Sequence, residues 1–393
     1  MNYILFDDNR RDTLLPLTFI RPVADIRVGI LTIREKWEKF LGVHTSTLTE
    51  EYLGKKYPLE REQNNILING SVMPDKALVR SILSLLPNQA LVEEDCIIAM
   101  HLTSEDIDNV QDVECEEIIY KECFLCIRNP WDVFTLNEAA LKADFELITR
   151  GRKSAVPDAS NTLFHKENIF IEEGARILCS VLNAENGPIY IGNKAEIMEG
   201  CLVRGPFAMN DHATLKMGTR VYGPTTIGAY SKIGGEIDNS VIFSYSNKAH
   251  EGYLGHAVIG EWCNLGAGTN NSNLKNTYEK VKIWSYAEET FVETGLQFCG
   301  LIMGDYTKTG IGTMFNTGTV VGMNTNIFGQ GLQRNFIPSF SWGGTSGFKE
   351  YKIDQAIKVA QRMHSRRGLE FGENDQEILK TVFNLSFRYK KVY

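Results

Sequence analysis

Apolar residues recur at every sixth position in the middle of the chain. The register comprises Ile191, Ile197, Val203, Met209, Leu215, Val221, Ile227 and Ile233. Hydrophobic residues make up 43% of the chain, so eight hits in one register arise by chance roughly once in a thousand. Neither an α-helix nor an ordinary strand has a period of six, so this stretch predicts a repeat architecture.

A second register, four residues after the first, holds small residues in all but one case. Its members are Ala195, Cys201, Phe207, Ala213, Thr219, Thr225 and Ser231. Glycines fall between the two registers, where a sharply turning chain needs permissive backbone. The pattern resembles the hexapeptide repeat of left-handed parallel β-helices, in which three six-residue sides form one triangular coil. We therefore expect a rigid rod whose coils bury their apolar side against one another.

The six-residue pattern is interrupted and then resumes. It returns at Ile259, Leu265, Phe291, Gln297, Met303, Phe315, Val321 and Ile327. We expect the rod to occupy residues 169–342, with a break between Asn239 and Val258. A break in a regular repeat is where function is expected.

The regions on either side of the rod have other patterns. Residues 1–150 alternate apolar strands, at 3–6 and 65–70, with helical periods at 30–40 and 76–86, which predicts an α/β domain. Residues 151–168 form a polar linker, and residues 343–393 form a helical tail with helices over 351–366 and 375–387. The predicted fold is an α/β domain, a left-handed parallel β-helix and a helical tail.

Composition narrows the partners. The chain has 393 residues, 41 Lys and Arg against 49 Asp and Glu, and a net charge of −8, which disfavours nucleic acid and anionic membranes. No apolar run approaches the ~20 residues that span a bilayer, so we expect a cytoplasmic protein. The eight cysteines show no disulfide framework. Cys123 and Cys126 form a lone C-x-x-C in an apolar segment that predicts a buried strand, with a redox or metal role as the alternative.

The N-terminal domain carries a moderate motif. The segment Arg10 to Pro22, Arg-Arg-Asp-Thr-Leu-Leu-Pro-Leu-Thr-Phe-Ile-Arg-Pro, resembles the sugar nucleotidyltransferase signature without its glycines. Asn129 to Asn137, beginning Asn-Pro-Trp-Asp, is similar to an element that closes this domain in the family. The resemblance implies nucleotide binding by Arg10, Arg11 and Arg21, with Mg²⁺ held at Asp132. Ser71 stands where the family commonly has a metal-binding aspartate. The alternative is that the arginines are solvated surface residues.

The chemistry that this resemblance implies is nucleotidyl transfer. A sugar-1-phosphate oxygen attacks the α-phosphorus of a nucleoside triphosphate and releases pyrophosphate, so the protein must neutralise clustered negative charge with cations and Mg²⁺.

The closest resemblance lies in the predicted break. Residues 248–256, Lys-Ala-His-Glu-Gly-Tyr-Leu-Gly-His, and 264–274, Asn-Leu-Gly-Ala-Gly-Thr-Asn-Asn-Ser-Asn-Leu, resemble the acetyltransferase half of the bifunctional N-acetylglucosamine-1-phosphate uridyltransferase/glucosamine-1-phosphate acetyltransferase family. The resemblance implies acetyl-CoA and UTP as cosubstrates and a homotrimer with sites between neighbouring rods. Its candidate residues are His250 and Asn273 for catalysis and Arg220, Glu236, Lys248 and Tyr253 for substrate binding.

These residue types suit acetyl transfer to an amine. A histidine takes the amine proton as the C–N bond forms, which is the role implied for His250, and an amide such as Asn273 supports the developing oxyanion. Asp238 and Asn239 stand where familiar members have two lysines, so sugar specificity can differ. His256 is a rival histidine, which we expect to face solvent.

Three functions stay open from the sequence. The first is a two-headed enzyme that makes UDP-N-acetylglucosamine. The second is a single-activity nucleotidyltransferase whose rod serves assembly or regulation, and the third is a non-catalytic scaffold.

Overall fold

The computed structural model of the chain describes residues 1–107, 110 and 113–390. Contacts divide it into two compact units. The N-terminal unit comprises Met1–Leu14, Ile20–Ile26 and Leu31–Asn129, and the rod unit comprises Leu15–Phe19, Arg27–Ile30 and Pro130–Tyr393. The sequence prediction instead placed residues up to 150 in the first domain.

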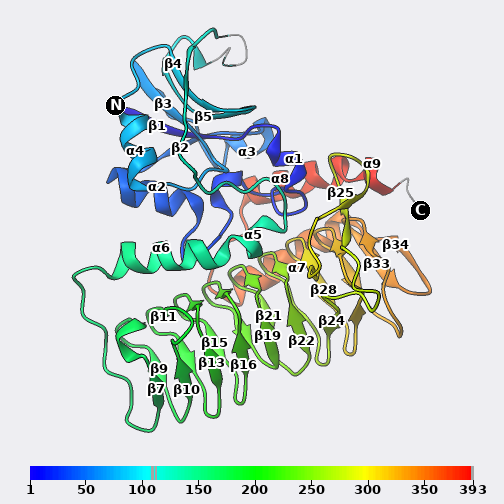
Figure 1. Ribbon diagram of the computed structural model, residues 1–393. Coiled ribbons are helices and arrows are strands. Elements are labelled where there is room, and N and C mark those ends of the chain that lie inside the picture. The colour runs from blue at the N-terminus through cyan, green and yellow to red at the C-terminus, as the bar shows by residue number, and fades with distance from the viewer. Residues whose placement is uncertain (108–109, 111–112, 391–393) are drawn as a thin grey trace. The chain divides into compact units, whose positions relative to one another are not determined.

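The N-terminal unit is built on a six-stranded mixed sheet, which confirms the predicted α/β class (Figure 1). In spatial order its strands are β2 Ser46–Leu48, β1 Asn2–Phe6, β3 Asn64–Asn69, β5 Cys96–Thr103, β4 Gln89–Glu93 and β6 Glu116–Ile119. Its helices are α1 Arg10–Thr13, α2 Ile33–Leu41, α3 Glu51–Gly54 and α4 Lys76–Leu83, with a 3₁₀ turn η1 at Val23–Asp25. β1 runs parallel to both β2 and β3, whereas β5 is antiparallel to its neighbours.

Local sequence explains the main elements of this unit. Ile4 and Leu5 in β1 are fully buried because the strand lies in the middle of the sheet. α2 begins with a capping box between Thr32 and Glu35 and ends at Gly42, whose φ of 72° a side chain disfavours. Asp75 caps α4 by accepting from the N–H groups of Ala77 and Leu78. These signals set the helix ends within a few residues of the predicted ones.

The rod unit is a parallel β-helix of stacked coils, seen from green to orange in Figure 1, which confirms the predicted left-handed hexapeptide fold. One side is the six-stranded sheet of β7 Thr162–Phe164, β10 Val181–Asn183, β13 Leu202–Arg204, β16 Arg220–Tyr222, β19 Glu236–Asp238 and β22 Tyr253–Gly255. The second side has nine strands, namely β8 Ile169–Ile171, β11 Ile189–Ile191, β14 Phe207–Met209, β17 Thr225–Ile227, β20 Val241–Ile242, β23 Val258–Ile259, β27 Leu301–Met303, β30 Thr319–Val321 and β32 Phe336–Ile337.

The third side of the rod is assembled in two parts. The first part contains β9 Arg176–Ile177, β12 Glu196–Ile197, β15 Thr214–Leu215, β18 Lys232–Ile233 and β21 Asn247–Lys248. The second part contains β28 Lys308–Thr309, β31 Asn326–Ile327, β33 Ser341–Gly344 and β34 Gly347–Glu350. Asn264 forms single bridges to Asn247 and to Lys308, so it joins the two parts.

The two sequence registers line the interior of the rod. All eight positions of the first register are at most 3% exposed and belong to one apolar core. The small residues of the second register are fully buried beside the corners. The period of six is therefore set by packing inside the prism. Phe291 and Gln297, which the pattern had included, lie outside the core and are exposed.

The coils continue through residues 239–258, so the predicted break there is wrong. What changes is the length of the coil. Leu202 pairs with Arg220, Arg220 with Glu236, and Glu236 with Tyr253. The coil that starts at Arg220 is the shortest of the three, because a corner is trimmed. Shorter corners shift the spacing while every side keeps its strand.

The true interruption lies further along the chain. Val241 pairs with Val258, an ordinary coil away, whereas Val258 pairs with Ile302, after more than twice that length of chain. The additional residues form an excursion between β24 Asn270–Asn271, which pairs with β29 Met314–Phe315, and β27. It contains an antiparallel hairpin of β25 Lys282–Ser285 and β26 Thr290–Glu293.

One corner of the rod carries a ladder of stacked rings. The ring centroids of His212 and Tyr230 lie 4.6 Å apart, those of Tyr230 and Tyr245 5.1 Å, and those of Tyr245 and Trp262 4.3 Å. All four residues have φ between 57° and 62°, a left-handed conformation that costs roughly 1–2 kcal/mol per non-glycine residue. Stacking of about 0.5–1.5 kcal/mol per pair offsets part of this cost.

Helices flank the coils within the rod unit. α5 Asp132–Thr135 and α6 Asn137–Thr149 precede the rod, and a 3₁₀ turn η3 at Lys166–Asn168 lies in its first coil. The fully buried Asn137 side chain accepts from Gly29 N and Thr226 Oγ1 and donates to Pro224 O. The tail forms α7 Ile353–Ser365, α8 Glu373–Leu385 and α9 Phe387–Lys390, which confirms the predicted helical C-terminus.

Candidate functional sites

Successive coils on one side of the rod contribute to a polar network that the sequence showed only in part. Asn273, at the start of the excursion, donates from Nδ2 to the Tyr253 hydroxyl at 2.8 Å and to His256 Nδ1 at 3.0 Å. The Tyr253 hydroxyl donates to Asp238 Oδ2 at 3.3 Å. Asp238, Tyr253, His256 and Asn273 thus form one connected group, which we call the rod network.

Burial sets the charge of the histidine in this network. The His256 ring packs against Phe298, with centroids 5.2 Å apart, and against Phe134, at 5.8 Å. Desolvation lowers the pKa of His256 to about 4, so the ring is neutral at pH 7. Its Nδ1 lies 3.8 Å from Asp238 Oδ2, a distance compatible with an ion pair. We nevertheless assign a neutral ring, because Nδ1 accepts a hydrogen bond from an amide that can only donate.

The carboxyl and phenol groups of the network are also shifted by burial. Desolvation raises the pKa of Asp238, and the nearby Glu236 charge adds to the effect. Desolvation likewise raises the pKa of Tyr253, with the Asp238 charge as the next cause. The hydroxyl therefore stays protonated and oriented toward the carboxylate.

The predicted catalytic base lies on the same coil but outside the network. The His250 side chain is exposed, and within the described residues its ring has no hydrogen bond or ion pair. Gly252, two residues on, has φ of 127°, and a Cβ there would lie 2.1 Å from Thr269 O in the next coil. Glycine at this position lets the His250 turn close against its neighbour.

Lys248 is placed beneath this turn. It is 3% exposed, and its Nζ donates to Gly234 O at 3.1 Å and to His250 O at 2.9 Å. Desolvation lowers the pKa of Lys248 to about 8. The side chain supports the backbone of the candidate base, and its role in substrate binding stays a prediction.

Arg220 and Glu236 lie together on neighbouring coils, and their roles in substrate binding stay predictions. Arg220 Nη2 is 3.3 Å from Glu251 Oε2, and Arg220 Nε is 3.6 Å from Glu236 Oε2. The Tyr222 hydroxyl donates to Glu236. Glu236 and Glu251 thus share Arg220, with Lys248 as a second cation nearby, so part of the Arg220 charge is already offset before a sugar phosphate binds.

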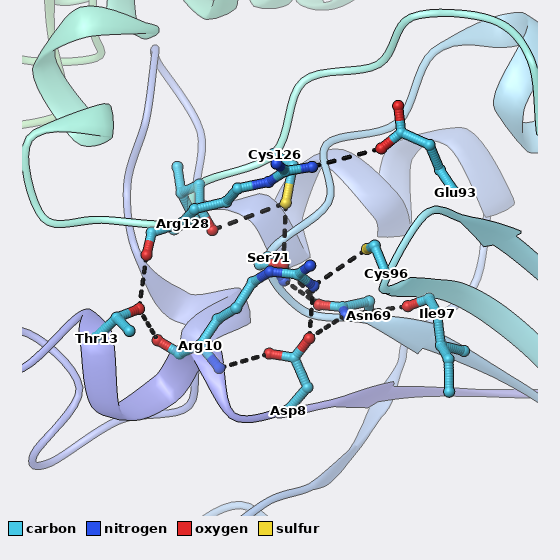
Figure 2. Close-up of polar contacts among 11 residues, drawn as sticks. Asp8, Arg10, Thr13, Asn69, Ser71, Glu93, Cys96, Ile97, Cys126 and Arg128 are labelled. Atoms are coloured by element: carbon cyan, nitrogen blue, oxygen red, sulfur yellow. Dashed lines mark hydrogen bonds and ion pairs between the residues drawn. The ribbon is translucent and has the colours of Figure 1, made fainter. Parts of the chain in front are cut away.

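The N-terminal unit has its own candidate site, shown in Figure 2. In the strand order β2-β1-β3, the strand that follows β1 in the chain lies on one side of β1 and the next strand lies on its other side. The carboxyl ends of β1 and β3 therefore form a topological switch point, which is where open α/β sheets bind ligands. Asp8, after β1, accepts from Arg10 Nη1 at 2.6 Å and from Asn69 Nδ2, at the end of β3, at 2.7 Å. Arg10 is the predicted nucleotide-binding residue at this edge.

Arg11 and Arg21 are buried rather than presented on the surface. They are 5% and 4% exposed. The Arg11 guanidinium donates to Asp7 Oδ2 at 3.1 Å, to Arg21 O at 3.0 Å and to the Tyr52 hydroxyl at 2.8 Å. These contacts hold the Arg10–Pro22 segment against β1, which excludes the reading of Arg11 as a solvated surface residue.

The described residues of this unit do not assemble a preformed magnesium site. Ser71 is 1% exposed, and its hydroxyl donates to Asn69 Oδ1 at 2.7 Å. Asp132, the predicted metal ligand, begins α5 in the rod unit. In the described part of the chain no three His, Cys, Asp or Glu side chains group as metal ligands. The side chains present therefore do not fit a preformed Mg²⁺ site.

The C-x-x-C segment is not a buried strand, and both of its cysteines are free thiols. Cys123 is exposed, while Cys126 forms a single bridge with Val72. The Cys126 thiol contacts Ser71 Oγ at 3.2 Å, and Arg10 Nη1 lies 3.1 Å from Cys96 Sγ (Figure 2). A hydrogen bond from Cys96, more than any other contact, lowers the pKa of Cys126 to about 7, and Ser71 and Arg10 act in the same direction.

Comparison with known proteins agrees with both halves of this geometry. Residues 3–153 match the family described as sugar nucleotidyl transferase. The bifunctional sugar-1-phosphate nucleotidylyltransferase/acetyltransferase of Sulfurisphaera tokodaii is 24% identical over 220 residues, 56% of this chain and 48% of that protein. The bifunctional protein GlmU of Methanococcus maripaludis is 28% identical over 270 residues, 69% of this chain and 57% of its own length.

The chain is similar to these bifunctional enzymes at low identity. The family resemblance drawn from the sequence is confirmed at this level. The matches span about half or less of the length of the first relatives, falling to 21% for the GlmU of Methanocaldococcus jannaschii, which is 37% identical over 89 residues, 23% of this chain.

Solved structures match this chain only at low similarity. The polySia-specific acetyltransferase NeuO is 16% identical with a TM-score of 0.28, covering 53% of this chain and 94% of its own. An Arabidopsis UDP-N-acetylglucosamine acyltransferase is 14% identical with a TM-score of 0.29, covering 59% and 96%. The strand pairings described above, not these scores, define the fold. None of the helices among the described residues is both long and apolar enough for a bilayer span.

Proposed function

We propose that the chain is a bifunctional sugar-phosphate transferase. Its rod transfers the acetyl group of acetyl-CoA to glucosamine-1-phosphate, and its N-terminal unit transfers uridylyl from UTP to N-acetylglucosamine-1-phosphate, giving UDP-N-acetylglucosamine. The observation that carries the acetyl-transfer half is the rod network with the unpartnered His250 ring on the same coil. The family match of residues 3–153 supports the uridylyl-transfer half.

The acetyl-transfer step needs an unprotonated amine and a base. His250 takes the amine proton as nitrogen attacks the thioester carbon, and CoA leaves as the thiol. His256, neutral with a pKa of about 4, is too weak a base for this role near pH 7. It instead keeps the wall of the site uncharged.

The rod network changes the role that we propose for Asn273. Both of its N–H groups are donated to Tyr253 and His256, so oxyanion support requires the release of one of them. Its Oδ1 has no hydrogen bond within the described residues and is the atom free to receive an N–H of the acceptor amine. Asn273 then orients both the network and the nucleophile.

The N-terminal step relies on charge at the switch point. A sugar-1-phosphate oxygen attacks the α-phosphorus, and pyrophosphate leaves with negative charge that Arg10 stabilises. Mg²⁺ would arrive bound to the triphosphate, because the described side chains assemble no site of their own for it.

A second candidate function is favoured by the charge around Arg220. Two carboxylates already pair with this arginine, and, by the family resemblance, Asp238 stands where familiar members have a lysine. This balance disfavours a sugar phosphate on the rod and favours a single-activity nucleotidyltransferase whose rod serves assembly. In either case we propose a homotrimer, because the relatives' resemblance implies sites shared between rods.

One reaction mixture separates these functions. The purified chain is incubated with acetyl-CoA, glucosamine-1-phosphate, UTP and Mg²⁺, and free thiol and pyrophosphate are followed separately. His250→Ala should slow thiol release roughly 10²–10⁴-fold and leave pyrophosphate release unchanged, and Arg10→Ala should do the reverse. The matched control His44→Ala removes an exposed histidine of the N-terminal unit and should alter neither rate.

Each outcome has a defined meaning. Pyrophosphate without thiol supports the single-activity enzyme, and neither product supports a scaffold. A folded His250→Ala protein that releases thiol at the wild-type rate contradicts the role of His250.

A further inference from the structure

A cavity of about 640 Å³ lies within the rod unit, between the third side of the rod and the end of α7. Four cations line it, Lys232, Lys308, Arg366 and Arg367, and no Asp or Glu is among the lining residues. The chain as a whole carries a net charge of −8. A group of four cations without acidic neighbours in the wall is therefore a local reversal of charge that attracts anions.

Two of these cations stand at the ends of a row of four residues that runs along one side of the rod. Lys232 pairs with Asn247, and Asn264 bridges Asn247 to Lys308, so the four residues occupy successive coils. At roughly 4.8 Å per coil, the two lysines stand about 14 Å apart with two amides between them. This spacing suits an extended polar ligand rather than a single small ion.

Among the four cations, Lys308 has the strongest need for an anionic partner. Its Nζ donates one hydrogen bond, to Tyr306 O at 2.8 Å, and it forms no ion pair among the described residues. Desolvation lowers the pKa of Lys308 to about 8. A half-buried ammonium with two N–H groups that have no partner among the described residues is costly by itself, and an anionic ligand would remove that cost.

Asn247 supplies the complementary requirement. Its Oδ1 is buried and has no hydrogen-bond partner in the described structure. An acceptor in this position calls for a hydroxyl or N–H donor on the ligand. The cavity is therefore suited to a ligand that carries a negative charge beside a hydroxyl group, as a phosphorylated sugar or nucleoside does.

The outer wall of the cavity is held in place before any ligand binds. The His364 ring on α7 stacks on Trp262, with centroids 4.1 Å apart, and its Nε2 is 2.9 Å from the Tyr306 hydroxyl. Arg366 and Arg367 follow directly at the end of this helix, and Arg367 Nη2 donates to Tyr230 O at 3.2 Å. The arginines are therefore presented by an anchored element.

We propose that this cavity, whose lining includes Ala249 beside His250, is a binding site for a nucleoside diphosphate ester. Lys308 and the arginines contact the diphosphate, and Asn247 accepts from a sugar hydroxyl. The volume lies within the range of about 300–1,000 Å³ usual for small-molecule sites. The proposal does not depend on either transfer activity, because it concerns binding alone.

Calorimetric titration of the full chain tests the site. ADP, UDP-N-acetylglucosamine and CoA are titrated separately, so that the free nucleotide, the nucleotide sugar and the acyl carrier are distinguished. Lys308→Met and the double variant Arg366→Gln/Arg367→Gln should each weaken binding of at least one ligand about 10-fold or more, since a hydrogen bond to a charged group contributes that much. Arg10→Ala should retain this binding component, which separates it from the N-terminal site.

Matched controls keep the test decisive. Lys358→Gln and Arg362→Gln remove exposed cations of the same helix that do not line the cavity, and both should bind as the wild type does. Because Lys308→Met alters a half-buried position, the thermal unfolding of this variant is compared with that of the wild type. The double variant at Arg366 and Arg367, which follow the end of α7, leaves the interior of the rod unchanged. The proposal is overturned if the double arginine variant binds all three ligands with unchanged affinity. It is also overturned if the wild-type chain binds none of them at a ligand concentration of about 1 mM.

Discussion

The buried imidazole of His256 should make the rod sensitive to mild acid. Its folded-state pKa is about 4, and the ordinary value is 6.5. Since the folded pKa is depressed for a group that is charged when protonated, the unfolded chain binds a proton first as pH falls. Stability contributed by the neutral ring is therefore complete above about pH 6.5 and is lost between about pH 6.5 and pH 4.

The size of the effect follows from linkage. For pKa values of about 4 folded and 6.5 unfolded, lowering the pH from 7.5 to 5.0 removes roughly 2 kcal/mol of unfolding free energy. His256 retains some solvent contact, with 17% of its side chain exposed, so screening reduces this to an expected value of about 1 kcal/mol.

The assay is urea unfolding at pH 7.5 and pH 5.0, followed by circular dichroism. His256→Gln should show a smaller loss between the two pH values than wild type, by about 1 kcal/mol, because glutamine does not titrate. Asn273→Ala removes the donor that keeps Nδ1 unprotonated, so Asp238 can pair with the ring and the pH dependence should also shrink. His250→Gln, an exposed histidine on the same coil, serves as the control and should retain the wild-type difference. Equal pH dependence in wild type and His256→Gln would refute the assignment of a neutral buried ring.

Four further results are expected. Arg11→Met should destabilise the N-terminal unit by about 3 kcal/mol in chemical unfolding, because it leaves the buried Asp7 carboxylate without its cation, whereas Arg10→Met, at a more exposed pair, should cost less. Iodoacetamide should label Cys126 with a half-maximal rate near pH 7 and leave Cys96 unmodified by mass spectrometry, since burial and hydrogen bonding raise the pKa of Cys96. Glu251→Gln should lower the KM for glucosamine-1-phosphate by freeing Arg220, and an unchanged KM would count against a phosphate site there. Sedimentation should show a trimer, and a monomer under assay conditions would contradict shared sites.

The period of six predicted the rod because it is a local consequence of packing inside a prism. Every position from Ile191 to Ile233 in that register points into the core, and no long-range information is needed to see it. The same argument failed at 239–258, because the corner after Ile233 is shorter and Arg220 meets its partner Glu236 sooner than Leu202 meets Arg220. A shortened corner and an interrupted coil both appear in the sequence as a shift in the six-residue spacing, so the sequence alone does not distinguish them.

The true excursion was hidden for the opposite reason. Residues 272–300 contain apolar residues such as Phe291 that continue the count of six, although the side chain is 44% exposed on a hairpin. Strand formation in a hairpin has a period of two, which satisfies a period of six as well. Only the pairing of Val258 with Ile302 distinguishes them.

The N-terminal motif was found by residue type, but the roles of its arginines depend on burial. Arg10, Arg11 and Arg21 look alike in the sequence, whereas Arg11 is tied inside the unit by Asp7 and Tyr52. Arg10 and Arg11 lie in the short helix α1 that follows β1, where successive residues point to different sides of the helix. Composition alone cannot make that distinction.

His256 shows which signal for the site was available in the sequence. In a coil solenoid, residues one coil apart lie side by side, so the coil repeat places Arg220, Glu236 and Tyr253 in one line and brings Asp238 beside the turn that holds His256. That rule favours His256 as a site residue over a solvent-facing one. It does not predict Asn273, whose position depends on the excursion, nor the phenylalanines that desolvate the ring. The coil therefore supplies the carboxylate and the phenol of the network by repetition. The excursion supplies the amide and, with Phe298, part of the apolar cover, and these two features keep the His256 ring neutral.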